Sequence, residues 1–138
     1  AALGFKGLLV GQSREVATKR MLQAMENPYL RCIGHPTTRL IGDREGMDLD
    51  WDALFAKAKE RGIAFELNAS WTRLDLDDVH CRAVKRAGVL VAINSDAHSP
   101  QQVDFRYGVS QARRGWLEAR DVVNAMSWMK FERWLKRQ

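Results

Sequence analysis

The fold is decided by the stretch DDVHCRAVKRAGVLVAI, which spans residues 77–93. An aspartate at position 77 or 78 can cap a helix on which Ala83, Val84 and Ala87 recur at helical spacing, and Gly88 closes that helix. The apolar, β-branched run of residues 89–93 then has the composition of a buried strand. The stretch therefore predicts one helix followed directly by one strand.

The same unit occurs twice more, upstream of this stretch. Asp50 can cap a helix that Gly62 closes, and residues 63–67 form the next strand. Ser13 can cap an earlier helix, and residues 30–34 form its strand. Strands that alternate with helices of this length imply parallel βαβ connections. We therefore predict an α/β protein with one domain over residues 1–138, ending in two short helices over residues 118–126 and 127–136.

The composition limits the classes of protein. At 138 residues, with 46% hydrophobic and 28% charged residues, the chain is expected to bury a single core. No apolar run is long enough for a membrane span and no secretory leader is visible, so we expect a cytoplasmic protein without a membrane partner. The net charge of +5 favours a polyanionic partner such as nucleic acid, although a solvated basic face is the commoner explanation. Cys32 and Cys81 lack the spacing of a zinc ribbon or a disulfide framework, and we interpret both as buried small hydrophobes.

Polar residues with useful chemistry follow each predicted strand. His35 follows the first, Glu66 and Asn68 end the second, and Asp96 and His98 follow the third. The carboxyl ends of parallel strands meet at one edge of a sheet, and residues two apart in extended backbone project to the same side. Asp96 and His98, joined by His35, could therefore bind a divalent metal with positions left open for water. Such a metal could generate hydroxide near neutral pH and hold a phosphate oxygen.

Each of these signals also has a simpler explanation. A single Asp-x-His is a weak pattern, and a histidine after a strand is often only hydrogen-bonded in a loop. Glu66 and Asn68 could merely satisfy the hydrogen bonds of their neighbours. His80 is in phase with the apolar positions of its helix, so we place it in or at the border of the core. No glycine-rich phosphate loop and no serine nucleophile elbow follows a strand, which argues against a dinucleotide or nucleoside triphosphate site.

Four groups of short motifs then occur along the chain in a fixed order. They are IGHPTTRL (residues 33–40), ELNA with RLDL (66–69 and 73–76), INSDAHS (93–99), and YGV with ARRGWL (107–109 and 112–117). In this order they resemble the polymerase-and-histidinol-phosphatase (PHP) domain of bacterial family X DNA polymerases. The resemblance covers the chain from about Ser13 onward. It implies part of a distorted (β/α)7 barrel, and a metal-dependent phosphodiesterase that acts as a 3′ to 5′ exonuclease with three bound divalent metal ions such as Mn²⁺ or Zn²⁺.

The resemblance also assigns roles to individual residues. His35 matches the histidine ligand of the family's His-Pro motif, and Asp96 and His98 match its closing Asp-x-His ligands. Arg39 and Asn68 match positions near the catalytic site, where Arg39 would offset the charge that develops on the reacting phosphate.

The chain also departs from the family pattern. The family's opening His-x-His strand and its further His, Asp and Glu ligands have no counterpart, and residues 1–11 contain no histidine where the family would place one, at about residues 4–8. We therefore expect either a fragment of a longer protein or a divergent relative with a reduced metal site. Half a barrel exposes strand edges, so we expect pairing with the missing N-terminal half or with a second copy.

Three functions stay open on this sequence. The first is a phosphoesterase that acts on nucleic-acid 3′ ends. The second is an inactive or truncated module that binds DNA through Arg113, Arg114 and the basic C-terminal tail. The third is a phosphatase of the same superfamily that acts on a small phosphate ester such as histidinol phosphate.

Overall fold

A four-stranded parallel sheet forms the centre of the structure, a computed structural model that describes residues 2–4 and 11–136. Its strands are β1 (Ala2–Gly4), β2 (Cys32–Gly34), β3 (Ala64–Asn68) and β4 (Val91–Asn94), and they lie side by side in chain order. Phe65 of β3 lies opposite Ile33 on one side and opposite Val91 on the other. The predicted α/β class is confirmed, whereas closure into a seven-stranded barrel stays a prediction.

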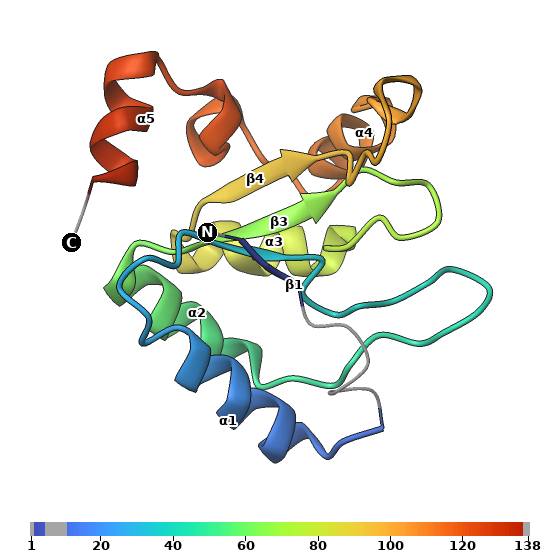
Figure 1. The fold of residues 1–138 in the computed structure, drawn as a ribbon, viewed down its shortest axis with the longest axis vertical. Helices are drawn as coiled ribbons and strands as arrows, with labels where there is room; N and C mark the ends of the chain where they lie inside the picture. The colour runs from blue at the N-terminus through green and yellow to red at the C-terminus, as the bar shows by residue number, and fades with distance from the viewer. Residues whose placement is uncertain (1, 5–10, 137–138) are drawn as a thin grey trace.

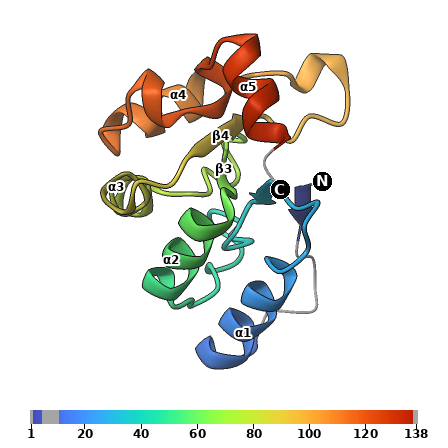
Figure 2. The ribbon, with the colours of Figure 1, turned by 90° about the vertical axis from the view of Figure 1, so that its left-hand side faces the viewer.

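The helices follow one another around one side of the sheet. α1 (Arg14–Ala24), α2 (Trp51–Arg61) and α3 (Asp78–Ala87) connect the strands, and α4 (Arg106–Arg114) follows β4. Each helix contacts the next, as Figures 1 and 2 show. Among the described helices, none has both the length and the apolar composition that crossing a bilayer requires.

The ends of these helices are set by residues that the sequence indicates. The Ser13, Asp50 and Asp77 side chains each accept a hydrogen bond from the backbone N–H three residues further on. Gly62 and Gly88 end α2 and α3 with φ angles of 66° and 70°, a left-handed conformation that glycine adopts without a Cβ clash. The three predicted helices are therefore confirmed, and Asp77 rather than Asp78 caps the third.

The main core lies between the helices and one face of the sheet. Ile33, Phe65, Leu67 and Val91 point to this face and are fully buried. Each buried side chain of this size contributes about 1.5–3 kcal/mol. Because strand side chains alternate, the same packing fixes where the residues of the opposite face lie.

The opposite face carries small and polar side chains. Near the start of the strands, Ala64 and Ala92 are covered by Val123 and by Trp134 of α5 (Trp128–Leu135). The Trp134 indole Nε1–H donates a hydrogen bond of 3.0 Å to the Gly62 carbonyl, which fastens α5 to the end of α2. Toward the carboxyl ends of the strands, this face carries polar residues and forms the candidate site.

In the C-terminal third of the chain, α5 confirms the helix predicted over residues 127–136, one predicted helix is wrong and one helix was not predicted. Residues 118–126 form two 3-10 turns, Ala119–Asp121 and Val123–Ala125, and not a helix, because Val122 between them is extended and pairs with Val91 of β4. Residues 106–114, to which the sequence analysis assigned no element, form α4. The buried residues of α4 are Gly108, Gln111 and Ala112, so the helix lacks the apolar stripe that would have revealed it.

The extended backbone at Val122 covers the outer edge of β4. Val122 forms a parallel bridge with Val91. Two residues on, the Asn124 side chain accepts from the Ile93 N–H at 2.8 Å and donates to the Ile93 carbonyl at 3.0 Å, in the manner of a neighbouring strand. The edge of β4 is therefore not open at these positions, in contrast to the exposed edges expected of half a barrel. Pairing with a missing half or a second copy stays a prediction, and along β4 it would require this segment to move.

Replacing Asn124 by leucine is expected to lower the free energy of unfolding by about 1 kcal/mol, because both hydrogen bonds to Ile93 are lost. Asn124→Asp keeps the acceptor for the Ile93 N–H but places a carboxylate oxygen against the Ile93 carbonyl oxygen, so it should lose at least as much stability. Urea unfolding measures both changes, and light scattering tests whether the uncovered edge promotes dimers. Equal stability of all three proteins would show that Asn124 does not protect the edge.

Candidate functional site

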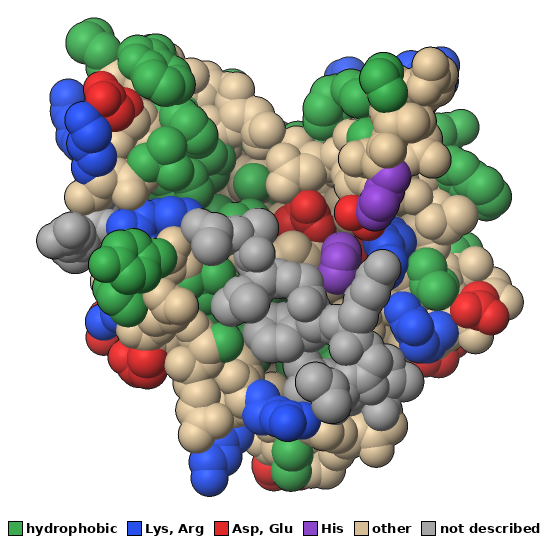
Figure 3. All heavy atoms as spheres, in the orientation of Figure 1, with side chains coloured by type: hydrophobic (Ala, Val, Ile, Leu, Met, Phe, Trp, Pro, Cys, Tyr) green, Lys and Arg blue, Asp and Glu red, His purple; other side chains and the backbone are tan. Residues whose placement is uncertain are grey.

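The carboxyl ends of β2, β3 and β4 bring the predicted site residues to one edge of the sheet. His35 follows β2, Asn68 ends β3, and Asp96 and His98 follow β4. Figure 3 shows a hollow on the molecular surface in which histidine, acidic and basic side chains lie next to one another. The parallel register sets Asn68 level with Asn94, so polar positions of β3 and β4 face the same space.

A buried carboxylate, that of Glu66, links the three strand ends. Its Oε2 atom accepts a hydrogen bond from the His35 backbone N–H and another, of 3.3 Å, from the Asn68 side-chain amide. Its Oε1 atom accepts from the Asn94 amide at 3.0 Å. These donors replace the water that the carboxylate loses on burial. Glu66 therefore holds the ends of β2, β3 and β4 in a fixed relation to one another.

His35 lies where β2 turns into the following loop. Its φ of 28° is unusual for a residue other than glycine. The residue is buried, and its Nδ1 atom has no hydrogen-bond partner among the described residues. Buried polar atoms normally have partners, and rare backbone conformations concentrate at functional sites. The His35 Nδ1 atom could therefore accept a metal, and its role as a metal ligand stays a prediction.

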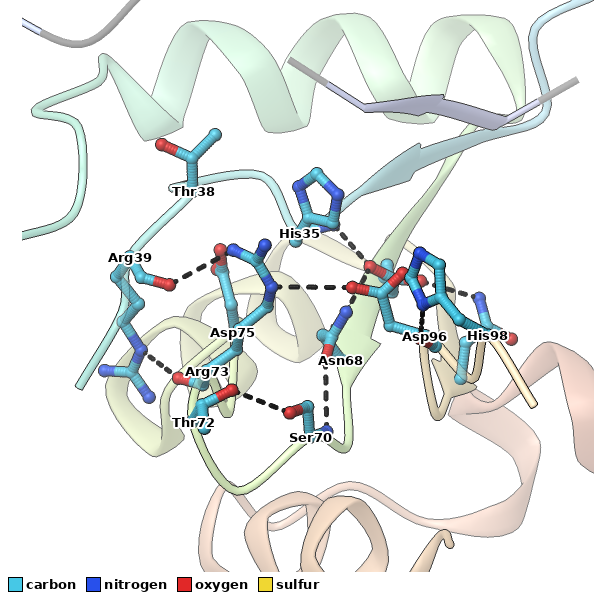
Figure 4. Close-up of polar contacts among 12 residues, drawn as sticks. His35, Thr38, Arg39, Asn68, Ser70, Thr72, Arg73, Asp75, Asp96 and His98 are labelled. Carbon is cyan, nitrogen blue, oxygen red and sulfur yellow. Dashed lines mark hydrogen bonds and ion pairs between the residues drawn. The ribbon is translucent and has the colours of Figure 1, made fainter. Parts of the chain in front are cut away.

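Asp96 and His98 lie in the loop after β4 and are more accessible than His35. The Asp96 carboxylate faces the Arg73 guanidinium, with 3.4 Å between Oδ2 and Nε. The His98 ring bends back so that its Nδ1 atom lies 2.7 Å from the Asp96 carbonyl oxygen (Figure 4). The His98 backbone N–H donates to the Gln102 side chain at 2.7 Å. Asp96, like His35, has a positive φ, of 55°.

Arg39 fastens the loop between β3 and α3. Its Nε donates to the Arg73 carbonyl at 2.6 Å, its Nη2 donates to the Leu74 carbonyl, and its Nη1 lies 3.7 Å from Asp77. With its guanidinium engaged in this way, Arg39 positions the loop that carries Arg73. A direct catalytic role for Arg39 stays a prediction.

Asn68 is fully buried at the end of β3. Its amide donates to Glu66, and its Oδ1 accepts from the Ser70 N–H at 3.1 Å, so the side chain joins the strand end to the loop that follows. This geometry makes Asn68 a positioning residue, and contact with a substrate stays a prediction.

Asp75 is a buried carboxyl group in the same loop. Burial raises the pKa of Asp75 from 3.8 to about 6, although hydrogen bonds from Thr37 and the charges of Arg39 and His35 act in the opposite direction. Its Oδ2 accepts from the Thr37 N–H at 2.9 Å, which ties the loop after β2 to the loop after β3. The sequence analysis gave Asp75 no role, although it lies in the RLDL motif.

The other histidine and the two cysteines lie outside the site. The His80 ring contacts Trp51, with 4.4 Å between the ring centroids, and its Nδ1 lies 2.7 Å from Asp77, which confirms its place at the border of the core. Cys81 is buried as predicted, whereas Cys32 is only half-buried. Burial raises the pKa of both thiols to about 12, so neither cysteine supplies a thiolate near neutral pH.

A pocket of about 500 Å³ opens beside Asp96 and His98. Its wall includes Arg73 and two aromatic residues, Trp71 and Tyr107, that the sequence analysis did not place in the site. The period-two rule pointed to Glu66, but no local signal separated Trp71 and Tyr107 from ordinary surface aromatics. A pocket of this size falls within the range that small ligands occupy.

The described residues fit a divalent metal in their chemistry, since imidazole and carboxylate groups suit manganese and zinc and the His35 Nδ1 atom lacks a partner. They do not by themselves bring three histidine, cysteine or acidic side chains together as a metal-binding group. Of residues 4–8, where the resemblance would place another histidine, only Gly4 lies within the described residues. The metal site therefore stays a proposal.

The known proteins similar to this chain include a DNA polymerase and probable phosphatases. DNA polymerase/3'-5' exonuclease PolX of Bacillus subtilis is 42% identical over 127 residues, which is 91% of this chain and 22% of that protein. A probable phosphatase of Caldicellulosiruptor saccharolyticus is 34% identical over 86 residues, covering 59% of this chain and 34% of the phosphatase. A probable phosphatase of Clostridium acetobutylicum is 33% identical over 88 residues, covering 59% and 33%.

The extent of these matches limits what they establish. No protein-family model matches the chain. The chain spans about a fifth of the polymerase and about a third of each phosphatase. Within these limits, the chain is homologous to a segment of bacterial PolX and to bacterial probable phosphatases.

Proposed function

We propose that the chain forms part of a metal-dependent phosphodiesterase that removes nucleotides from the 3′ ends of nucleic acid. The observation that carries the proposal is the 42% identity to PolX over 91% of the chain. The structure is compatible with it, because Asp96 and His98 line a pocket at the edge of the sheet where His35 follows β2. The net charge of +5 suits a polyanionic substrate.

Some of the described residues would bind the metal, and others would position them. His35, Asp96 and His98 would bind the metal, and Glu66 holds the His35 backbone in place. Arg39 anchors the loop that sets Arg73 against Asp96. A divalent metal at this edge would supply a Lewis acid for a phosphate oxygen and a bound hydroxide near neutral pH.

Metal binding is the first test, because this chain can be tested for it even if it lacks the catalytic activity of the longer PolX protein. Isothermal titration with Mn²⁺ should give saturable binding, and His35→Ala and Asp96→Ala should each weaken it by more than about tenfold. Mutation of a residue that only orients a metal ligand already lowers metal affinity by about tenfold or more, so loss of a ligand should cost at least as much. Mass spectrometry of the purified chain measures metal content independently. His80→Ala is the matched control, because His80 packs against Trp51 outside the site.

Degradation of a 3′-labelled single strand in Mn²⁺ then tests the reaction. Nucleotide release that Asp96→Ala abolishes is the expected result. If His35→Ala and Asp96→Ala bind metal as tightly as the parent chain, the metal site is wrong. If metal binds but no nucleotide is released, the chain carries the site without the activity.

A second candidate function is hydrolysis of a small phosphate ester. It is favoured by the probable phosphatases, which are 33% and 34% identical to the chain over more than half its length. Release of inorganic phosphate from a small monoester, with no degradation of the strand, would support this function over the exonuclease.

The third possibility, an inactive DNA-binding module, stays a prediction. Arg113 and Arg114 are exposed on α4, and Arg114 is paired with Asp78 at 3.5 Å. Binding to DNA that persists with chelator present and weakens steeply with added salt would favour this possibility, provided that no metal binds.

A further inference from the structure

The pocket beside the candidate site has an aromatic wall that the proposed chemistry leaves unused. Trp71 lies in the loop after β3, and Tyr107 lies in the first turn of α4. Both line the same pocket as Arg73, Asp96 and His98. The same cavity is therefore lined by an aromatic surface and by two candidate metal ligands.

Neither aromatic ring is buried in the hydrophobic core. Trp71 is 70% exposed and Tyr107 is 50% exposed. Among the described residues, the aromatic contacts join other rings, such as Trp51 with Phe55 and Phe65, and none involves Trp71 or Tyr107. Exposed tryptophan and tyrosine side chains at the mouth of a polar pocket are typical of binding residues, because they supply a large rigid surface with few rotatable bonds.

We infer that Trp71 and Tyr107 hold the base of the terminal nucleotide of a nucleic-acid strand, with its phosphate directed toward Asp96 and His98. The inference rests on the proposed function and names the substrate class. Every base has a π face, so stacking on an aromatic ring binds any terminal nucleotide without reading its sequence. That property suits an enzyme that shortens a strand one nucleotide after another.

The charges along the pocket agree with this orientation. Arg73 is the one lysine or arginine among the described residues of the pocket wall, which also includes the carboxylates of Asp96 and Asp104. The Asp104 carboxylate is paired with Arg106, with 2.7 Å between Oδ2 and Nη2. The Arg73 Nε atom lies 3.4 Å from the Asp96 carboxylate, at the metal end of the pocket, so the phosphate of a bound nucleotide belongs at that end and its base at the aromatic wall. A small ester without a base would leave both rings exposed to water.

The test compares two short single strands that differ only in whether the 3′-terminal nucleotide carries a base or is abasic. Binding is measured by fluorescence anisotropy of a 5′ label in chelator, so turnover and metal binding do not enter. The parent chain should bind the strand with the base about 5- to 150-fold more tightly, the range that stacking of one base gives. Trp71→Ala and Tyr107→Ala should each lose part of the preference, the double variant should bind both strands equally weakly, and Trp71→Phe should keep more of the preference than Trp71→Ala.

Trp128→Ala is the matched control, because Trp128 on α5 is also 70% exposed and lies outside the pocket. It should keep the full preference for the base. Equal binding of the two strands by the parent chain would overturn the inference, as would an unchanged preference in Trp71→Ala. If the parent chain binds no metal but still prefers the strand with the base, the proposed function is contradicted and the base-binding subsite is supported.

Discussion

Replacement of Glu66 by leucine is expected to lower the free energy of unfolding by about 3–5 kcal/mol. Leucine fills the space but accepts no hydrogen bond, so the His35 N–H and the Asn68 and Asn94 amides lose their acceptor. A buried donor without a partner costs about 1–3 kcal/mol, and the backbone N–H of His35 cannot turn toward water. Urea unfolding with an unchanged m-value measures the loss.

Glu66→Gln should be far milder, at about 1 kcal/mol or less. The glutamine oxygen can accept from the His35 N–H and the Asn68 amide, and the Asn94 amide can turn over so that its oxygen accepts from the new NH₂ group. Glu60→Leu is the surface control, because among the described residues the Glu60 carboxylate pairs with Lys57 on the exposed side of α2, and such a pair contributes little to stability. Equal losses for Glu66→Gln and Glu66→Leu would show that size, and not hydrogen bonding, decides the effect.

The order of helices and strands could be read from the sequence because its signals are local. A capping aspartate, an apolar run and a closing glycine lie within a few residues of one another, as in Asp50 to Gly62. Helix α4 was missed because its buried residues include a glycine and a glutamine, so contact with the sheet rather than periodicity places it. Residues 118–126 were assigned to a helix because local sequence does not reveal that Val122 pairs with β4.

The candidate site was predictable only in part, for the same physical reason. His35, Asp96 and His98 follow strands, and parallel strands bring their ends together whatever the loops do. The groups that position them come from segments distant in sequence. Arg39 binds the Arg73 carbonyl 34 residues away, and Glu66 binds the His35 N–H 31 residues away. No local pattern encodes such contacts, so these roles appear only once the chain is folded.

Asp75 gives the second large expected effect, which depends on pH. Burial raises the pKa of Asp75 to about 6 in the folded chain, against an ordinary value of 3.8. Between these two values the folded state keeps a proton that the unfolded state releases, so the folded chain loses stability as pH rises from about 4 to about 6. The full loss is about 3 kcal/mol, at 1.36 kcal/mol for each pKa unit. Asp75→Asn cannot ionise and escapes this loss.

The difference in unfolding free energy between Asp75→Asn and the parent chain isolates the effect from all other titrating groups. It should shift by about 3 kcal/mol in favour of the variant between about pH 4 and about pH 7, because the asparagine oxygen still accepts from the Thr37 N–H. Asp104 provides a control of opposite sign. Its hydrogen bonds with Arg106 lower the pKa of Asp104 to about 2, so Asp104→Asn should lose stability relative to the parent chain as pH rises from about 2 to about 4, and should show no further change between about pH 4 and about pH 7. A flat difference for Asp75→Asn across this range would mean that the buried carboxyl group is ionised at little cost, and that Thr37 and the nearby Arg39 compensate its burial in full.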